Sequence, residues 1–328
     1  MTTFSFSVII VYTERERKYV TKEFAYRPQT LEDLSGQDKA KKMLSICIKA
    51  AKIKRKTLPH VLISGPSGCG KTTAANIIAN EMDKKAKTYA APSIKTVQDM
   101  ADILSTVEEG DIIFLDEIQS LKTKIQEILY FSMEQFVLDV NIDGEALRQE
   151  MPHFTLIGAT TSLGGLELPC RNRFPIQIEL EPYNLESMAK IVKTAYKAMK
   201  VDVDDECAKI IGSASRSTPR IANNNVRCIY DFALVLNDGK ITKDVVLDAF
   251  EIMGINKFGL NQMDMNYLQY LADARKAIGV DTLATALGTD RVSLESVVEP
   301  YLIANQYIIK GARGRSITQK GLDIVKEF

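Results

Sequence analysis

The sequence predicts a three-part chain of the α/β class, in which a domain built on a parallel sheet precedes an all-helical domain and a small C-terminal domain. Three observations lead to this fold. The apolar run "HVLISG" (60–65) enters a glycine-rich loop and then a helical pattern, and similar apolar runs recur at 111–117 and 154–161, as in buried parallel strands. From Asn184 the pattern is helical only. Beyond Gly259, helical stretches are followed by two short β-rich runs around a Gly/Arg turn.

Composition places the chain among globular proteins. Its 328 residues are 45% hydrophobic and 26% charged, a balance typical of chains that bury a core. Lys and Arg together number 42, as do Asp and Glu, so a basic surface for nucleic acid must be local. Five scattered cysteines without C-x-x-C spacing suggest neither a disulfide framework nor a zinc site and favour reduced thiols in a cytoplasmic protein. The N-terminal apolar run falls far short of the roughly 20 residues that span a bilayer, so no membrane partner is expected.

The elements follow in order along the chain. Residues 1–25 form an N-terminal extension to which no function is assigned. A helix over 38–56 is expected to be amphipathic, with Met43, Leu44, Ile46, Ile48 and Ala51 on its apolar side. The helical domain is expected to contain four helices, at 185–199, 205–215, 219–236 and 242–253.

The stretch "GPSGCGKT" carries the strongest chemical signal. It fits the phosphate-loop pattern G-x-x-x-x-G-K-[ST] and lies between a predicted strand and a predicted helix, the context that the pattern requires. Backbone N–H groups of such a loop surround phosphate oxygens, the lysine reaches the β- and γ-phosphates, and the hydroxyl that follows can hold Mg²⁺. The sequence therefore predicts ATP and Mg²⁺ as ligands of Gly65, Pro66, Ser67, Gly68, Cys69, Gly70, Lys71, Thr72 and Thr73.

Acidic residues end the next apolar run. In "IIFLDE", Asp116 is expected to hold Mg²⁺ together with Thr72, and Glu117 to orient the attacking water as a base. An acid pair in solvent at a strand end is the alternative. Thr160 and Thr161 end a further apolar run, where a hydroxyl would reach the γ-phosphate or the water, or where a β-branched residue simply closes a strand.

The ordered segments "GPSGCGKT", "IIFLDE", "LIGATT", "RNRF" and "STPRIANN" resemble the AAA+ ATPases. Among these, "STPRIAN" (217–223) and "VEPYLIANQYIIKGARGRSIT" (298–318) are similar to the bacterial Holliday-junction branch-migration motors, the RuvB family. The resemblance covers about residues 25 to 325. It implies a P-loop AAA+ domain at 26–183, a helical lid domain at 184–256 and a winged-helix DNA-binding domain at 257–328.

The same resemblance implies roles for residues outside the phosphate loop. Arg173, with Arg171 beside it, stands where the family has an arginine that reaches the ATP site of a neighbouring subunit; an arginine pair on a solvated loop is the alternative. Arg220 would be a second sensor at the γ-phosphate, or simply the start of a helix after Pro219. Tyr183, Arg27 and Pro28 would line the adenine pocket.

Basic residues gather in the C-terminal domain. Between residues 310 and 320 there is no Asp or Glu, and four cations suit a phosphate backbone without sequence preference, although a solvated hairpin tip is the alternative. We expect DNA contacts from Lys310, Arg313 and Arg315, with Lys320 as the fourth cation of the segment.

The resemblance implies a DNA-dependent ATPase that drives Holliday-junction branch migration as a homo-oligomeric ring, expected to be a hexamer. Its expected partners are double-stranded DNA, the four-way junction and a RuvA-like junction-binding protein. The chain departs from the family at Gln119, Asn172 and Pro175, and its segment 138–153, which aligns with the partner-docking hairpin, is shorter and less apolar. Two alternatives remain open: a clamp-loader-like ATPase, which would end in a helical collar, and a DNA-binding module that keeps ATP as a structural ligand.

Overall fold

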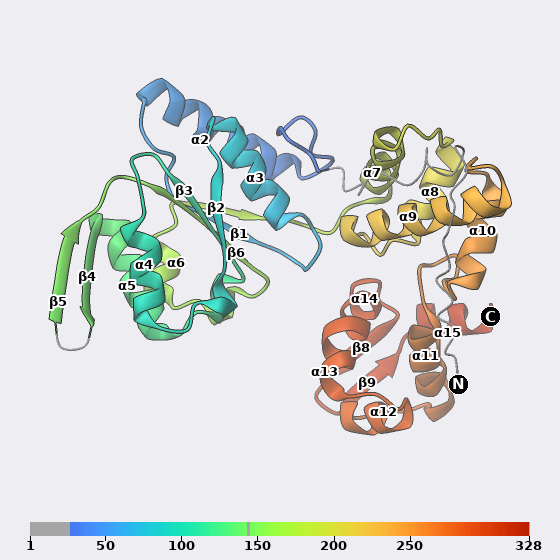
Figure 1. The fold of residues 1–328 in the computed structure, drawn as a ribbon. Helices are drawn as coiled ribbons and strands as arrows, with labels where there is room; N and C mark the ends of the chain where they lie inside the picture. The colour runs from blue at the N-terminus through green and yellow to red at the C-terminus, as the bar shows by residue number, and fades with distance from the viewer. Residues whose placement is uncertain (1–26, 143–144, 328) are drawn as a thin grey trace, which may run out of the picture.

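The structure, a computed structural model, describes residues 27–142 and 145–327. The predicted N-terminal extension lies outside the described residues. Figure 1 shows three parts in chain order: a sheet with helices on both faces, a group of packed helices, and a C-terminal domain of short helices and a hairpin. The predicted fold is therefore confirmed at the level of class and domain order.

The first part is built on five parallel strands, β1 (Val61–Ser64), β2 (Ala86–Ala90), β3 (Ile112–Asp116), β6 (Thr155–Thr160) and β7 (Ile176–Glu179). Their order across the sheet is β2-β3-β6-β1-β7. Successive side chains of a strand point to opposite faces, so β1 sends Val61 and Ile63 into one core and Leu62 into another. Because all five strands are parallel, their carboxyl ends meet at one edge, where open α/β sheets bind ligands.

Helices pack on both faces of this sheet, namely α2 (Asp38–Lys54), α3 (Lys71–Glu81), α4 (Val97–Ser105), α5 (Thr123–Gln135) and the short α6 (Leu168–Asn172). Helix α2 buries Leu44, Ile48 and Ala51, which recur at intervals of four and three residues along one side. Met43 is 38% exposed and Ile46 is 60% exposed, because they lie on other sides of the helix. The expectation that these two residues belong to the apolar face is wrong.

A two-stranded antiparallel hairpin leaves the domain directly after α5. Its strands are β4 (Val137–Ile142) and β5 (Glu145–Glu150), and Figure 1 shows it at the end of the molecule far from the helical domain. Leu138 and Val140 are buried against the core beneath the sheet, which anchors the base of the hairpin. Residues 143–144, between the two strands, lie outside the described residues.

The helical domain contains the four predicted helices, α7 (Leu185–Ala198), α8 (Asp205–Ser213), α9 (Pro219–Leu236) and α10 (Lys243–Ile252). Two N-caps explain where helices begin: the side chain of Asn184 accepts from Ser187 N–H, and that of Asp204 accepts from Cys207 N–H. Apolar residues of all four helices belong to the same buried cluster as one face of the sheet. The buried apolar cluster therefore continues from the sheet into the helical domain.

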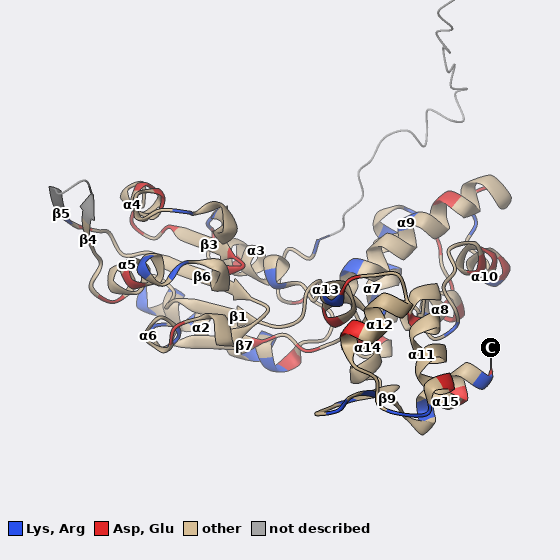
Figure 2. Cartoon of the chain, turned by 90° about the horizontal axis from the view of Figure 1, so that it is seen from below, with Lys and Arg blue, Asp and Glu red and all other residues tan. Residues whose placement is uncertain are grey.

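The C-terminal domain has a core of its own and contains α11 (Gln262–Ala274), α12 (Val280–Ala286), α13 (Arg291–Ser293), η4 (Leu294–Val298), α14 (Glu299–Ala304), β8 (Ile308–Gly311), β9 (Gly314–Ile317) and α15 (Gln319–Lys326). The turn η4 has π-helical geometry and precedes Pro300, which has no N–H to donate to the preceding turn. Strand β9 also bonds Ile278, which adds a third backbone segment to the hairpin. Charges of both signs are spread over all three domains (Figure 2).

Candidate functional site

The glycine-rich loop connects β1 to α3 in a conformation that requires glycine. Gly65, Gly68 and Gly70 have φ angles of 147°, 78° and 98°, in or near the left-handed region that other residues rarely adopt. A Cβ on Gly68 would also lie 2.6 Å from Thr218 Cγ2. Helix α3 begins at Lys71, so its free N–H groups face the loop. This arrangement of turn and helix start is an anion-binding site.

The ammonium of Lys71 lies inside the curve of this loop. Lys71 Nζ donates to the carbonyl oxygens of Gly65 at 2.8 Å and Pro66 at 2.9 Å, and the residue is 8% exposed. Burial lowers the pKa of Lys71, and the negative charge of Asp116 partly opposes that shift. A phosphate in the loop would offer this cation acceptors with a full charge in place of the two carbonyls, so the loop fits the predicted ligand.

The residues predicted to hold a metal ion are next to each other. Thr72 Oγ1 donates to Asp116 Oδ2 at 3.0 Å, and Asp116 Oδ1 accepts from Glu117 N–H at 3.0 Å. Hydroxyl and carboxylate oxygens suit Mg²⁺, which usually keeps several waters and substrate phosphates as its other ligands. Among the described residues no three His, Cys, Asp or Glu side chains form a metal site by themselves. The pair therefore fits a metal that arrives with a nucleotide.

Glu117 stands at the carboxyl end of β3 with a left-handed backbone, φ 56°. It is exposed and lines the same cavity as Lys71 and Thr72. A non-glycine residue held at positive φ is uncommon and clusters at functional sites. The carboxylate is thus displayed toward the cavity instead of continuing the direction of the strand.

The two threonines after β6 have different environments. Thr160 is buried, and its hydroxyl donates to Ser162 O at 2.8 Å and accepts from Ser162 N–H at 3.0 Å. Thr161 is exposed, lines the cavity, and its Oγ1 accepts from Gln119 Nε2 at 3.3 Å. Thr160 therefore closes a strand, and Thr161 is the residue available to a ligand. Sequence reasoning noted Gln119 only as a departure and missed this bond.

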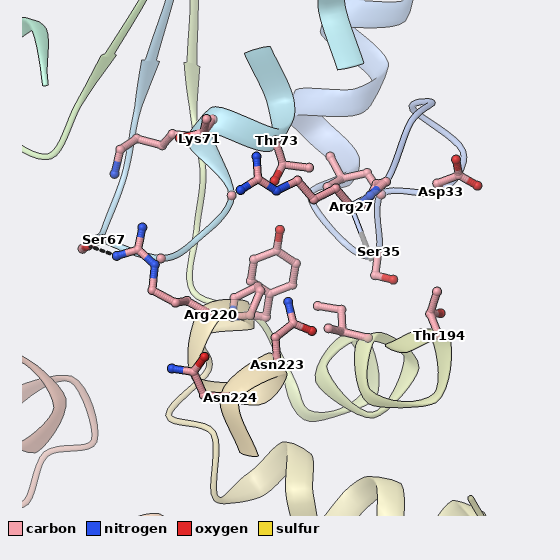
Figure 3. Close-up of a pocket in the computed structure, with 18 of the residues that line it drawn as sticks. Arg27, Asp33, Ser35, Ser67, Lys71, Thr73, Thr194, Arg220, Asn223 and Asn224 are labelled. Carbon is pink, nitrogen blue, oxygen red and sulfur yellow. Dashed lines mark hydrogen bonds between the residues drawn. The ribbon is translucent and has the colours of Figure 1, made fainter. Parts of the chain in front are cut away.

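The phosphate loop, the strand ends and the helical domain enclose one cavity of about 350 Å³ (Figure 3). Such a volume lies in the range of small-molecule sites, about 300 to 1,000 Å³. The predicted residues Arg27, Pro28, Tyr183 and Arg220 line it. Asp33 and Ser35, in the segment that Arg27 and Pro28 begin, and Asn223 and Asn224, in the segment "STPRIANN", also line it, although no role was predicted for them. No motif pointed to the further lining residues Ile191, Thr194 and Arg227.

Tyr183 and Arg220 tie the helical domain to the phosphate loop. Tyr183 is 5% exposed, its hydroxyl donates to Cys69 O at 3.2 Å, and burial raises its pKa to about 12. Arg220 donates from its guanidinium to Ser67 Oγ at 3.3 Å and from its backbone N–H to Gly68 O at 3.4 Å. Figure 3 shows Arg220 reaching from the start of α9 to the loop. A ligand bound in the loop would therefore lie next to residues that are hydrogen-bonded to the helical domain.

Three sequence families match consecutive parts of the chain. The family described as "Holliday junction DNA helicase RuvB P-loop domain" matches residues 26–180, "RuvB AAA lid domain" matches 183–256, and "RuvB C-terminal winged helix domain" matches 257–326. The chain belongs to the RuvB family. The predicted resemblance is thereby confirmed.

Individual relatives agree with the RuvB family in length and structure. The Holliday junction branch migration complex subunit RuvB of Campylobacter lari is 42% identical over 322 residues, 97% of this chain and 96% of the relative. The subunit of the same name from Kosmotoga olearia is 42% identical over 300 residues, 90% and 88% of the two chains. The solved structure titled "Thermotoga maritima RuvB Holliday junction branch migration motor" matches with a TM-score of 0.81 at 37% identity, covering 92% of this chain and 98% of that one.

The clamp-loader alternative is wrong. It predicts a helical collar after the lid, whereas residues 257–326 match the RuvB winged helix domain and contain the antiparallel hairpin of β8 and β9. Within the described residues no helix is long and apolar enough to cross a membrane.

The two arginines of "RNRF" lie outside the cavity of their own chain. Arg173 donates from Nε and Nη2 to Glu134 Oε2 at 3.1 and 2.7 Å and from Nη1 to Pro169 O at 2.9 Å, with its guanidinium over the Tyr130 ring. Its side chain keeps 29% exposure, and these bonds use three of the five guanidinium donors. Arg171 is half-buried in the last turn of α6.

The winged-helix hairpin requires a correction. Arg315 is 6% exposed, and its guanidinium donates to Glu299 Oε1 at 2.7 Å and to Glu295 Oε1 at 2.7 Å. Glu299 is itself 1% exposed and also accepts from the hydroxyl of Tyr267. The prediction of Arg315 as a DNA contact is wrong, because its guanidinium is buried and paired with two carboxylates that precede the segment in sequence. Arg315 instead anchors β9 to the helix beneath it.

The remaining cations of the segment differ in how free they are. Lys310 is half-exposed but lies 3.0 Å from Glu295 and 3.8 Å from Glu299. Hydrogen bonds from Arg291, Lys310 and Arg315 lower the pKa of Glu295 to about 2, so its negative charge persists at neutral pH. Arg313 lies exposed at the hairpin tip between β8 and β9. Of the three predicted DNA contacts, Arg313 is the best placed and Lys310 is partly neutralised.

A matched pair of variants tests whether Arg315, unlike Arg313, stabilises the folded domain. Arg315→Met is expected to lower the free energy of unfolding by about 3 to 5 kcal/mol, because it leaves the buried Glu299 carboxylate without its cation. Arg313→Ala is expected to change that free energy by less than about 0.5 kcal/mol. Urea denaturation measures both. An Arg315→Met protein as stable as the wild type would contradict the anchoring role.

Proposed function

We propose that this chain is an ATP-hydrolysing DNA motor of the RuvB type, which drives Holliday-junction branch migration in recombination and repair. The observation that carries the proposal is one continuous chain in which a phosphate loop with paired acids is bonded to a helical lid and followed by a winged-helix domain. The relatives from Campylobacter lari and Kosmotoga olearia are named as branch migration complex subunits.

In the proposed reaction, the backbone N–H groups of the loop and the ammonium of Lys71 bind the β- and γ-phosphates of ATP. Thr72 and Asp116 would hold Mg²⁺, which when bound supplies positive charge to the phosphate oxygens. Glu117 takes a proton from the attacking water while the bond between the γ-phosphorus and the bridging oxygen breaks, giving ADP and phosphate. Thr161 donates its hydroxyl to the γ-phosphate or orients that water, held in place by Gln119.

Two arginines complete the site in this proposal. Arg220 senses the γ-phosphate within its own subunit, which its bond to Ser67 supports. Arg173 reaches the γ-phosphate of the neighbouring subunit, with Arg171 beside it. An arginine that leaves one subunit for the next defines a head-to-tail interface, and such an interface gives a ring when the rotation between neighbours closes. We therefore propose a homo-oligomeric ring, a hexamer in its expected form.

The partners follow from the surfaces. Double-stranded DNA would contact the exposed Arg313 at the hairpin tip. Affinity falls as salt rises, and replacing Arg313 should make the slope of log affinity against log salt less steep by about 0.9. The hairpin of β4 and β5, which projects from the ATPase domain, would dock a RuvA-like junction-binding protein. Tyr183, Arg27 and Pro28 would enclose the adenine. A cytoplasmic location completes the proposal.

A synthetic four-way junction with labelled arms tests the motor function. Incubation with the protein and ATP should convert the junction to duplex products, whereas a non-hydrolysable ATP analogue should leave it intact. The reaction is run with and without a RuvA-like junction-binding protein, which separates motor activity from loading. If ATP is hydrolysed and the junction is bound but no products form in either condition, the branch-migration proposal fails.

A further inference from the structure

The loop between α8 and α9 connects the phosphate loop with the C-terminal domain. Arg220, the second residue of α9 and so directly after this loop, contacts Ser67 and Gly68 beside the cavity, as described above. Four residues earlier, Arg216 inserts into the C-terminal domain. Two arginines four residues apart thus contact two different domains, Arg220 the ATPase domain and Arg216 the C-terminal domain.

Arg216 makes its contacts with three segments of the C-terminal domain. Its Nε donates to Gly259 O at 3.0 Å, and its Nη2 is ion-paired with Asp264 Oδ2 at the start of α11. The guanidinium lies 5.0 Å from the ring centroid of Tyr301 on α14, whose hydroxyl donates to Phe258 O. The side chains of Arg216 and Asp264 are 13% and 0% exposed. This is a buried, oriented attachment and not a surface ion pair.

The segment between the two arginines is short and fixed. Arg216 and Ser217 both have left-handed backbones, φ 52° and 53°, which cost about 1 to 3 kcal/mol each and persist only where the surroundings impose them. Ser217 O accepts from the N–H of Tyr183, and Thr218 Oγ1 donates to Arg216 O. The loop therefore cannot stretch to absorb a movement of one end.

Among the described residues, the apolar cluster of the C-terminal domain is separate from that of the sheet and the lid. A further close contact lies next to Arg216, where a Cβ on Gly259 would approach Ala214 O to 2.9 Å. Buried ion pairs add little net stability, but removing one partner is costly, so such a pair serves best to fix geometry.

We propose that Arg216 is a positioning residue that transmits the state of the nucleotide site to the winged-helix domain through the rigid segment 216–220. When a phosphate draws Arg220 and the loop toward the γ-position, Arg216 carries α11 and α14 with it. The inference deepens the proposed motor function and rests on it. It assigns the mechanical link between ATP and the DNA-binding domain to one side chain that contacts that domain and does not line the nucleotide cavity.

The first test compares Arg216→Gln with Lys243→Gln, which removes an exposed ion pair with Glu206 inside the lid. ATP turnover is measured with and without duplex DNA, alongside DNA affinity and thermal unfolding. For Arg216→Gln we expect DNA-free turnover and DNA affinity near those of the wild type, with the stimulation of turnover by DNA lost. Lys243→Gln should keep the stimulation. Full stimulation in Arg216→Gln would overturn the proposal.

A second test needs neither DNA nor hydrolysis. The chain contains no tryptophan, so Tyr301→Trp places a single fluorophore beneath the Arg216 guanidinium. Adding ADP or a non-hydrolysable ATP analogue should shift the emission, and the shift should disappear when Arg216→Gln or Arg220→Met is added. Saturating nucleotide without a shift, or a shift that survives Arg216→Gln, would overturn the link. A shift in a protein that lacks DNA-stimulated turnover would refute only the motor function.

If Arg216→Gln fails to fold, Arg216→Lys replaces it in both tests. Lysine keeps the charge beside Asp264 but lacks the planar fork that serves Asp264 and Gly259 O together. Partial loss of the DNA stimulation and of the emission shift is expected. Wild-type values of both in Arg216→Lys would show that charge alone suffices and would overturn the oriented link.

Discussion

Replacing Arg173 by alanine is expected to lower the rate of ATP turnover by about 10³- to 10⁵-fold, which corresponds to roughly 4 to 7 kcal/mol of the barrier. The reason is that the guanidinium would neutralise charge that develops on the γ-phosphate of the neighbouring subunit. Arg173 is held toward the surface by Glu134 and Pro169 O, and two of its N–H donors remain for a phosphate. Steady-state turnover with duplex DNA measures the effect.

Arg171→Ala is the matched control, since it removes the other arginine of "RNRF", which lies inside α6, whereas Arg173 is the C-cap of that helix. It should retain most of the wild-type turnover. Mixing Arg173→Ala subunits with Glu117→Gln subunits should restore hydrolysis, because some interfaces then combine an intact Glu117 with an intact Arg173. Proven co-assembly without any recovery would contradict the action of Arg173 on a neighbour. Equal losses in both alanine variants would leave no basis for choosing Arg173 over Arg171.

Glu117→Gln is expected to abolish DNA-stimulated ATP turnover while leaving nucleotide binding intact. General-base catalysis contributes about 10²- to 10⁴-fold to rates, and an amide cannot accept the proton of the attacking water. The substitution keeps the shape of the side chain at its left-handed position, so the loss is chemical. Turnover and nucleotide affinity are measured on the same preparation.

The variant also decides the remaining alternative, in which ATP is only a structural ligand. In that case the wild type and Glu117→Gln would show equal, near-zero turnover. Asp116→Asn provides a contrast, because Asp116 is paired with Thr72 and its substitution should weaken metal-dependent nucleotide binding as well. Full turnover by Glu117→Gln would remove Glu117 from the reaction.

The sequence predicted the elements whose signal is local. The phosphate loop, the buried strands β1, β3 and β6 and the four lid helices each have a pattern within about twenty residues, and each appears where the pattern places it. Strand β2 was not predicted because its residues, "AKTYA", are partly exposed at a sheet edge and carry no apolar run. Strand β7 is short and alternates buried with exposed residues.

Predictions of side-chain roles were less secure where the deciding partner is distant in sequence. Arg315 has the charge of a DNA contact, and only the folded chain brings Glu299 and Glu295 to it. Met43 and Ile46 are apolar residues on a helix, and only the packing of α2 shows that they face away from the core. The bond from Gln119 to Thr161 joins two loops 42 residues apart. Local patterns contain none of this information.

The apolar core of the C-terminal domain is separate from the cluster that the sheet and the lid have in common. The buried apolar cluster of the ATPase domain continues into the lid, so separating the two would expose part of that cluster to water. The C-terminal domain has a separate apolar core, and the hydrogen bond from Arg216 to Gly259 O is part of its attachment to the lid. Because the attachment at Arg216 is buried and oriented, the C-terminal domain can follow a displacement of the lid as a unit, with its own interior unchanged.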